Sequence, residues 1–234
     1  MKRVAILQSN YLPWKGYFDL IAAVDEFIVY DCVQYTKNDW RNRNQIKTPQ
    51  GKSWLTVPVR QRSLEQTVAE TEVADARCFR KHWSTFRQNY AKAPHVRYCE
   101  ELLAPLFERL SLESMLSNVN VIAMNHICGV LGVATPIVDS SVYVIEGNRN
   151  ERLISLCRQA GASHYLSGPA ARVYLDEDAF LEAGIVVEWA EYQGYPEYPQ
   201  PHPPFDHYVS IMDLLASTGP DAGNFMRWTR REQS

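Results

Sequence analysis

Several features that would point directly to a function are missing from this sequence. The chain of 234 residues has no long apolar segment free of charge, and no basic start followed by an apolar run. We therefore predict neither a membrane span nor a signal peptide. The formal net charge is only -3, so the protein as a whole should not attract nucleic acid. Any site for an anion must be local.

Metal-binding and catalytic motifs are missing as well. The five cysteines are odd in number, widely spaced and without a CxxC pair, and the six histidines lack spacing such as HxxxH. This pattern argues against a disulfide scaffold and a zinc site, and it is typical of the reducing cytoplasm. The spacing assembles no Ser/His/Asp set and no paired-carboxylate signature. We therefore expect no metal and predict a cytoplasmic protein.

The sequence does contain a regular alternation of strand and helix patterns. Residues 3–8 and 26–31 are short apolar runs bounded by polar residues, which is typical of buried strands. Between them, apolar residues from 15 to 24 recur at helical spacing. Because a strand, a helix and a second strand in this order form a βαβ unit, we expect the two strands to be parallel.

The alternation continues toward the carboxyl end, with a helical stretch between. We predict a hairpin over 43–59 and further strands over 135–141, 163–168 and 184–192. Predicted helices cover residues 80–90, 102–110, 118–131, 151–160, 170–175 and 207–219. We predict a single α/β domain over 1–225 with a mostly parallel twisted sheet and a helical insertion near 75–131. Residues 226–234 should form a loose tail.

The end of the first predicted strand carries a group of polar and aromatic residues. Ligands of open α/β sheets bind beyond the carboxyl ends of the strands, where side chains of this kind would meet them. Aromatic rings offer stacking faces for a base or a sugar, and a glycine at a helix start permits close approach of a ligand. The expected binding residues are Gln8, Asn10, Tyr11, Trp14, Gly16 and Tyr17. Alternatively, Trp14 and Tyr17 are core residues.

The second predicted strand leads into a basic and aromatic stretch. Asp31 and Gln34 follow the strand, and "DWRNRNQIK" then adds Trp40, Arg41, Arg43, Asn44 and Lys47. Two arginines two residues apart lie on the same side of an extended strand, which suits a phosphate or a carboxylate. The alternative is an exposed basic face on a hairpin.

Two further features are weaker. In "YLSGPAARVY" a strand ends at Ser167 and Gly168 before a helix, which places backbone N–H groups where they could hold an anion. A tight turn between strand and helix explains the same residues. His82 lies on a predicted helix and is a natural general base near neutral pH, although a single histidine there is often structural.

Five stretches together resemble one known family. They are "LQSNYLPWKGYFDLI", "YDCVQYTKNDWRNRNQIKTPQGKSWLTVPV", "GASHYLSGPAARVYLDE", "GYPEYPQ" and "VSIMDLL", and the similarity runs from about Val4 to Gly219. They are similar to the WbqC-like family, bacterial proteins often encoded among genes for surface polysaccharide. The resemblance implies a part in O-antigen or lipopolysaccharide precursor synthesis. It further implies transfer of an acyl or aminoacyl group to the amine of a nucleotide-linked amino sugar.

A weaker, architectural resemblance concerns the opening strand, loop and helix. It is similar to that of HIGH-motif nucleotidylyltransferases, in which an H-x-G-H set grips the phosphates of ATP. The aligned positions here are Trp14, Lys15, Gly16 and Tyr17, so the glycine is kept and both histidines are replaced. ATP-dependent nucleotidyl transfer or ligation is therefore an alternative function. A sugar-nucleotide-binding protein without catalysis is another.

The leading hypothesis assigns a role to each predicted residue. Arg41, Arg43 and Lys47 would neutralise a diphosphate, while Tyr11, Trp14, Tyr17 or Trp40 would stack on base or sugar. Hydrogen bonds to hydroxyl groups would come from Gln8, Asn10, Asp31 and Gln34. His82 would be the general base, and Asp31 is the second residue predicted to be catalytic. The N–H groups of Ser167 and Gly168 would hold a donor phosphate or an oxyanion.

The expected partners follow from the same hypothesis. The acyl donor would be an acyl-coenzyme A or a donor derived from ATP. Nucleic acid is not expected unless an aminoacyl-tRNA is the donor, and a homodimer is one possible assembly.

Overall fold

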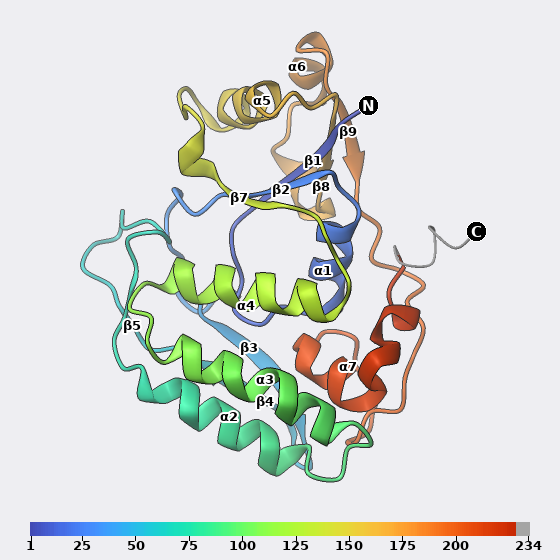
Figure 1. Ribbon diagram of the computed structural model, residues 1–234. Helices are drawn as coiled ribbons and strands as arrows, with labels where there is room; N and C mark the ends of the chain where they lie inside the picture. Colours follow the sequence, from blue (N-terminus) through green and yellow to red (C-terminus); the bar gives the residue numbers. More distant parts are fainter. Residues whose placement is uncertain (228–234) are drawn as a thin grey trace.

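Five parallel strands form the central sheet of the computed structural model, which describes residues 1–227 (Figure 1). The spatial order is β7-β2-β1-β8-β9, with bounds β1 (Arg3–Leu7), β2 (Glu26–Val29), β7 (Ile137–Asp139), β8 (His164–Ser167) and β9 (Val186–Trp189). Every pair of neighbours is parallel. The strand order therefore reverses between β1 and β8, as in doubly wound folds. The predicted α/β class with a parallel, Rossmann-like sheet is confirmed.

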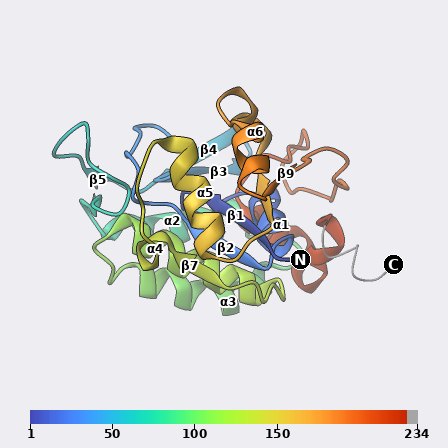
Figure 2. The same ribbon diagram turned by 90° about the horizontal axis from the view of Figure 1, so that it is seen from above.

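Helices cover both faces of this sheet. Alternate strand residues point to opposite faces: Ala5 and Phe27 join one core cluster, while Val4 and Ile28 join the other. The first face packs on α1 (Lys15–Ala22) and α4 (Leu116–Val130), and the second on α5 (Arg149–Gln159) and α6 (Glu177–Glu182). Figure 2 shows α5 and α6 lying over the strands.

A long excursion separates β2 from β7. It holds two hairpins, β3 (Arg43–Thr48) with β4 (Gly51–Thr56) and β5 (Val59–Arg60) with β6 (Glu72–Val73), followed by α2 (Arg77–Asn89), α3 (Val96–Leu110) and α4. The final helix, α7 (Ile211–Thr218), packs against α3 and β3. Short 3-10 turns cover Ser140–Val142, Pro169–Val173 and Gly219–Phe225. The hairpin predicted over 43–59 is therefore present.

Two helix predictions need correction. We expected a helix from Leu102, but α3 begins at Val96 and continues through Pro105, because its buried face anchors both halves. A helix expected over 170–175 is a 3-10 turn, and α6 starts later, at Glu177, where the Asp176 side chain accepts a hydrogen bond from the Ala179 N–H. Of the tail predicted over 226–234, Met226 is buried and Arg227 donates to the backbone carbonyls of Glu191 and Gln193 at 2.8 and 2.9 Å, while residues 228–234 lie outside the described residues. None of the helices within residues 1–227 has the length and apolar character needed to cross a bilayer.

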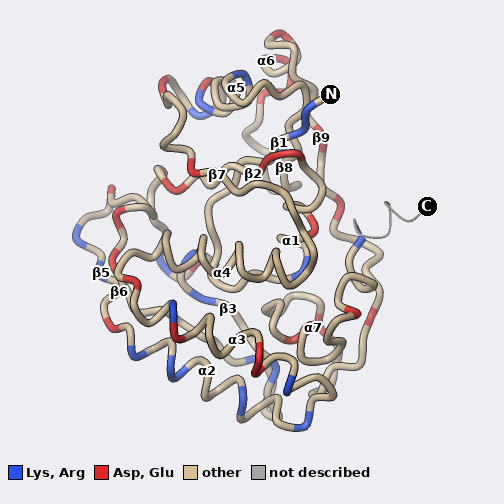
Figure 3. The backbone as a smooth tube through the Cα atoms, in the orientation of Figure 1, with Lys and Arg blue, Asp and Glu red and all other residues tan. Residues whose placement is uncertain are grey.

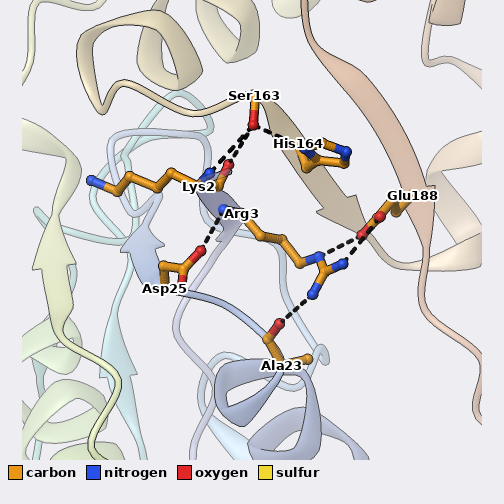
Figure 4. Close-up of polar contacts among 7 residues, drawn as sticks. All are labelled: Lys2, Arg3, Ala23, Asp25, Ser163, His164 and Glu188. Atoms are coloured by element: carbon orange, nitrogen blue, oxygen red, sulfur yellow. Dashed lines mark hydrogen bonds and ion pairs between the residues drawn. The ribbon is translucent and has the colours of Figure 1, made fainter.

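Polar contacts fix the start of β1, at the edge of the sheet opposite the carboxyl ends (Figure 4). The Arg3 guanidinium donates to both carboxylate oxygens of Glu188 on β9, at 2.5 and 3.2 Å, and to the Ala23 carbonyl at 3.4 Å. The Arg3 backbone N–H donates to the Asp25 carboxylate at 2.6 Å. These contacts connect β1 to β9 across β8 and to the end of α1.

A buried carboxylate fastens the proline-rich segment 190–208 to the helical part. Asp213, in the first turn of α7, is fully buried. It accepts hydrogen bonds from the hydroxyls of Tyr90 (2.6 Å) and Tyr198 (2.8 Å) and from the Gln200 side-chain amide (2.8 Å). The Tyr90 hydroxyl in turn accepts from the Lys47 backbone N–H at 3.0 Å. Burial raises the pKa of Asp213, and these donors oppose the increase.

Tyr90→Phe should therefore destabilise the fold. It removes one donor to Asp213 and leaves the buried Lys47 N–H without its acceptor, a loss of about 1–3 kcal/mol. Urea unfolding measures the change. Tyr174→Phe is the control, since Tyr174 is 45% exposed, and it should unfold like the parent. Equal stability of the two variants would contradict the role given to Asp213.

Candidate functional site: an aromatic pocket beyond the first strand

Aromatic and amide side chains from three distant segments meet just beyond the carboxyl end of β1. They enclose a cavity of about 170 Å³ that we call the aromatic pocket, lined by Asn10, Pro13, Trp14, Trp40, Asn44 and Tyr208. Four of these residues are among those predicted from the sequence. Pro13 and Tyr208 were not predicted. The pocket is small for a cofactor site and matches the size of a single ring more closely.

The loop between β1 and α1 is held in one shape by the loop and strand beside it. The Tyr11 N–H donates to the Trp40 carbonyl at 2.9 Å, and the Asn44 side-chain amide donates to the carbonyls of Tyr11 (3.2 Å) and Leu12 (2.9 Å). Leu12 has a positive φ of 43°, which is costly for a residue with a branched side chain. The Asn44 contacts stabilise this conformation. Asn44 thus shapes the pocket wall and also lines it.

Trp14 lines the pocket and belongs to a cluster of tyrosines. Its ring lies 5.0 Å from that of Tyr208, 5.2 Å from Tyr192 and 5.7 Å from Tyr195, centroid to centroid. The ring also covers Gly16, where an added Cβ would lie 2.3 Å from a Trp14 ring carbon. The glycine predicted to admit a ligand therefore admits the Trp14 ring instead.

Trp40 also lines the pocket. It is 43% exposed, and its ring lies 5.5 Å from that of Trp54, on which the Arg43 guanidinium stacks at 4.1 Å. Arg43 also donates to Asn38, at 3.2 Å to the side-chain oxygen. Arg43 therefore packs on Trp54, the neighbour of Trp40, and does not line the pocket.

Arg41 is the cation beside the pocket. Its guanidinium donates to the Asn10 side-chain oxygen and lies 3.8 Å from the Asp39 carboxylate. The Nε atom of Arg41 is buried and has no hydrogen-bond partner within residues 1–227. Arg41 and Arg43 thus have different partners and do not form the paired fork that we expected. Lys47 is buried away from the pocket, where its ammonium donates a hydrogen bond to the Pro204 carbonyl.

Asp31 connects the pocket loop to the sheet and to α4. It is 1% exposed and accepts from the Ser9 N–H (2.8 Å), the Ser9 hydroxyl (2.6 Å) and the Ser117 hydroxyl (2.5 Å). The Asn120 amide on α4 donates to the Ser9 hydroxyl at 3.0 Å and to the Arg41 carbonyl at 2.8 Å. Burial raises the pKa of Asp31, and the two serines oppose that effect. This geometry favours a positioning role over direct contact with substrate.

His82 is also buried, and both of its ring nitrogens have partners. Nε2 lies 3.1 Å from the Thr56 carbonyl, so it must carry the proton and donate. Nδ1 then accepts from the hydroxyl of the fully buried Tyr11, 2.9 Å away. Burial lowers the pKa of His82 to about 4. A neutral ring engaged on both sides links α2 to β4 and to the pocket loop, and it has no nitrogen left to act as a base.

The remaining predicted residues lie outside the pocket. The Tyr17 hydroxyl donates to the Gln8 carbonyl at 2.8 Å, inside the core. Gln34 is exposed and donates to the Leu64 carbonyl at 2.5 Å. Ser167 is buried beside Tyr165, and Gly168 precedes the 3-10 turn at Pro169.

Lys15, at a position aligned with the H-x-G-H set, is buried as well. Its ammonium donates to the Pro196 carbonyl at 3.1 Å and lies 5.0 Å from the ring centres of Tyr195 and Tyr198. Burial lowers its pKa to about 8. It therefore holds the proline-rich segment over α1. Within residues 1–227, no three His, Cys, Asp or Glu side chains are grouped so as to hold a metal ion.

The His82 environment predicts a pH dependence of stability. The pKa is near 4 in the folded protein and 6.5 in the unfolded chain, so the unfolded state binds the proton more tightly. The stability that the buried neutral His82 contributes is complete above pH 6.5, and it is lost as the pH falls toward 4. Between pH 7 and pH 5 it should decrease by about 2 kcal/mol.

Urea unfolding of the parent and of His82→Gln at both pH values measures this contribution. Glutamine keeps a donor for Thr56 and does not titrate, so the stability gap between the two proteins should narrow at pH 5. A gap independent of pH would show that His82 is not buried in its neutral form.

The contact between Gly16 and Trp14 gives a second test. Gly16→Ala should displace the Trp14 ring and cost about 1–3 kcal/mol, as overpacking does. Gly129→Ala on α4 is the matched control because nothing lies within 4 Å of its added Cβ, and it should be neutral or slightly stabilising. Tryptophan fluorescence detects a displacement of the Trp14 ring, and thermal unfolding measures the change in stability. A tolerated Gly16→Ala would contradict the close packing of the Trp14 ring on Gly16.

Comparisons with known proteins place the chain in a family. The model of the WbqC-like protein family matches residues 8–225, so the chain belongs to this family. It is 45% identical over 235 residues to Rv1507c of Mycobacterium tuberculosis, described as an uncharacterized protein, covering 99% of this chain and 100% of that protein. No solved structure matches the chain.

Proposed function

We propose that this member of the WbqC-like family binds a nucleotide-linked amino sugar and transfers an acyl group to the sugar amine, in the synthesis of a surface-polysaccharide precursor. The observation that carries the proposal is the aromatic pocket, in which Trp14, Trp40 and Tyr208 surround a space for one ring. Flat aromatic rings pack against the C–H faces of a sugar or the face of a base. The amides of Asn10 and Asn44 lie in the same wall, where hydroxyl groups need donors and acceptors.

Arg41 would hold the charged part of such a substrate. It is the cation bonded to a pocket residue, through Asn10, and its buried Nε has no partner within the described chain. A guanidinium in a partly buried setting binds phosphate or carboxylate strongly. The sugar ring would therefore lie among the aromatic residues, with its phosphate toward Arg41.

The transfer itself does not require a side chain to act as an acid or a base. The neutral amine attacks the carbonyl carbon of an acyl thioester or acyl-adenylate, a C–N bond forms, and the C–S or C–O bond breaks. The proton lost by the nitrogen leaves with the thiolate or phosphate group, or enters solvent. Positioning of the two reactants accounts for the acceleration in this scheme. Asp31 acts by fixing the loop through Ser9, and His82 acts by fixing Tyr11.

A specific observation favours a second candidate, a binding protein without turnover. Both residues predicted as catalytic, His82 and Asp31, are buried and fully engaged in hydrogen bonds. ATP-dependent nucleotidyl transfer has less support, because Lys15 and Gly16 are committed to Pro196 and Trp14 at the positions where phosphates would be gripped.

Calorimetric titration with UDP- and dTDP-linked amino sugars tests the site. Trp40→Ala and Tyr208→Ala should each weaken binding by about tenfold, or ~1.4 kcal/mol, through loss of an aromatic contact. Tyr174→Ala removes an exposed tyrosine outside the pocket and should bind like the parent. If the pocket variants bind as tightly as the parent, the pocket is not the site.

Mass spectrometry of the sugar nucleotide after incubation with acyl-coenzyme A, or with ATP and a carboxylic acid, tests the reaction. A mass gain on the amine that the pocket variants lose would support the transferase. Tight binding without a mass gain from either donor would favour the binding protein.

A further inference from the structure

Positive charge is concentrated in one part of this acidic chain. Residues 76–99 hold six of the 24 lysines and arginines and none of the 27 aspartates and glutamates. The rest of the chain therefore carries 18 cationic and 27 acidic residues, a net charge of -9. The six cations lie on α2, on the turn after it and on the first turn of α3, and we call them the α2–α3 basic face: Arg77, Arg80, Lys81, Arg87, Lys92 and Arg97. Figure 3 shows Lys and Arg positions, in blue, repeated along α2.

All six side chains belong to exposed residues, and most form no ion pair. Arg77 pairs with Asp75 at 2.9 Å and Arg87 with Glu100 at 2.8 Å. No ion pair involves the other four cations within the described residues 1–227. The charge of these four cations is therefore available to an external anion, which would replace counter-ions there rather than break internal ion pairs.

The shape of this face suits a polyanion chain. Between α2 and α3 a groove of about 570 Å³ is lined by residues that include Ser84, Gln88 and Arg97. Arg87 and Glu100 also line it and pair with each other, so Arg97 is the cation in the groove that forms no ion pair within the described residues. Arg80 and Arg87 are seven residues apart on one helix, which separates their Cα atoms by about 10 Å along the axis. Short hydroxyl and amide side chains between arginines are the usual partners of phosphate oxygens in nucleic-acid complexes.

The face has no feature for stacking bases or entering lipid. Its one tryptophan, Trp83, is packed on Phe86 and Phe107 at 5.6 and 5.5 Å. Tyr98 is half-buried, and no large hydrophobic side chain of α2 is exposed. Binding by this face would therefore use the backbone phosphates of a folded or duplex strand.

We infer that the α2–α3 basic face binds the phosphate backbone of a structured nucleic acid. The inference does not depend on the aromatic pocket. RNA and DNA offer the same phosphate chemistry, so the test includes both. An RNA that carries an aminoacyl ester would also serve as the donor for the proposed transfer.

Fluorescence anisotropy with a labelled RNA hairpin and a labelled DNA duplex, titrated at several salt concentrations, tests the inference. The parent should bind one or both, with an affinity that falls steeply as salt increases. The variant Arg80→Gln/Arg97→Gln should bind more weakly at every salt concentration. Its plot of log affinity against log salt should be flatter by about 2, or about 1 for each lost phosphate contact.

The control variant Arg149→Gln/Arg158→Gln removes two charges from α5, across the sheet. It should bind like the parent and keep the same salt slope. Absence of binding to either nucleic acid at low salt would overturn the inference, as would equal losses in both double variants. Binding to phosphatidylglycerol vesicles without binding to RNA or DNA would also overturn it and assign the face to a membrane. These substitutions leave the aromatic pocket unchanged. Titration of the same variants with sugar nucleotides therefore shows separately whether the proposed function fails.

Discussion

The hydrogen bonds to the Asp31 carboxylate hold together the parts of the molecule on which the pocket depends. This side chain follows β2, accepts from Ser9 after β1 and from Ser117 on α4, and is almost fully excluded from solvent. A buried carboxylate without donors would cost several kcal/mol, so the three hydrogen bonds determine where each element can lie. The loop that begins at Ser9 then carries Asn10 and Trp14 to the pocket. The position of the pocket therefore depends on how α4 packs against the sheet.

The proline-rich segment completes the pocket from the other end of the chain. Its contacts to Asp213 and Lys15 fix its path over α1, and Tyr208 lies at its end. Tyr208 is 58% exposed, so one wall of the pocket lies at the surface and is open to a ligand. Because Tyr208 and Trp40 are both exposed, a ring would enter the pocket without rearrangement of the core.

Local patterns in the sequence predicted the sheet and much of the pocket. The short apolar runs indicated β1 and β2, and the position of Asn10, Trp14, Trp40 and Asn44 after strand ends placed them near a ligand. Tyr208 was missed because the proline-rich segment was interpreted only as extended chain. The one signal that it returns to the core is its aromatic content, and Tyr195 and Tyr198 in it are indeed buried.

The incorrect expectations arose from side-chain direction. Cys78, Phe79, His82 and Phe86 follow helical spacing, so the pattern itself placed His82 on the buried face of α2. Arg41 precedes β3, where the two-residue alternation of an extended strand does not yet apply, and it therefore has partners different from those of Arg43. Residue type had suggested that His82 is a base, and the two-residue spacing of Arg41 and Arg43 had suggested a phosphate fork on the assumption that both lie in an extended strand.

The central claim is that the aromatic pocket holds the sugar ring of a nucleotide-linked amino sugar. Saturation-transfer difference NMR, with a UDP-linked amino sugar in excess over the protein, tests it most directly. We predict the strongest saturation on the ring protons of the amino sugar, and loss of that signal in Trp40→Ala. Saturation confined to the uracil and ribose protons, or a sugar signal unchanged in Trp40→Ala, would contradict it.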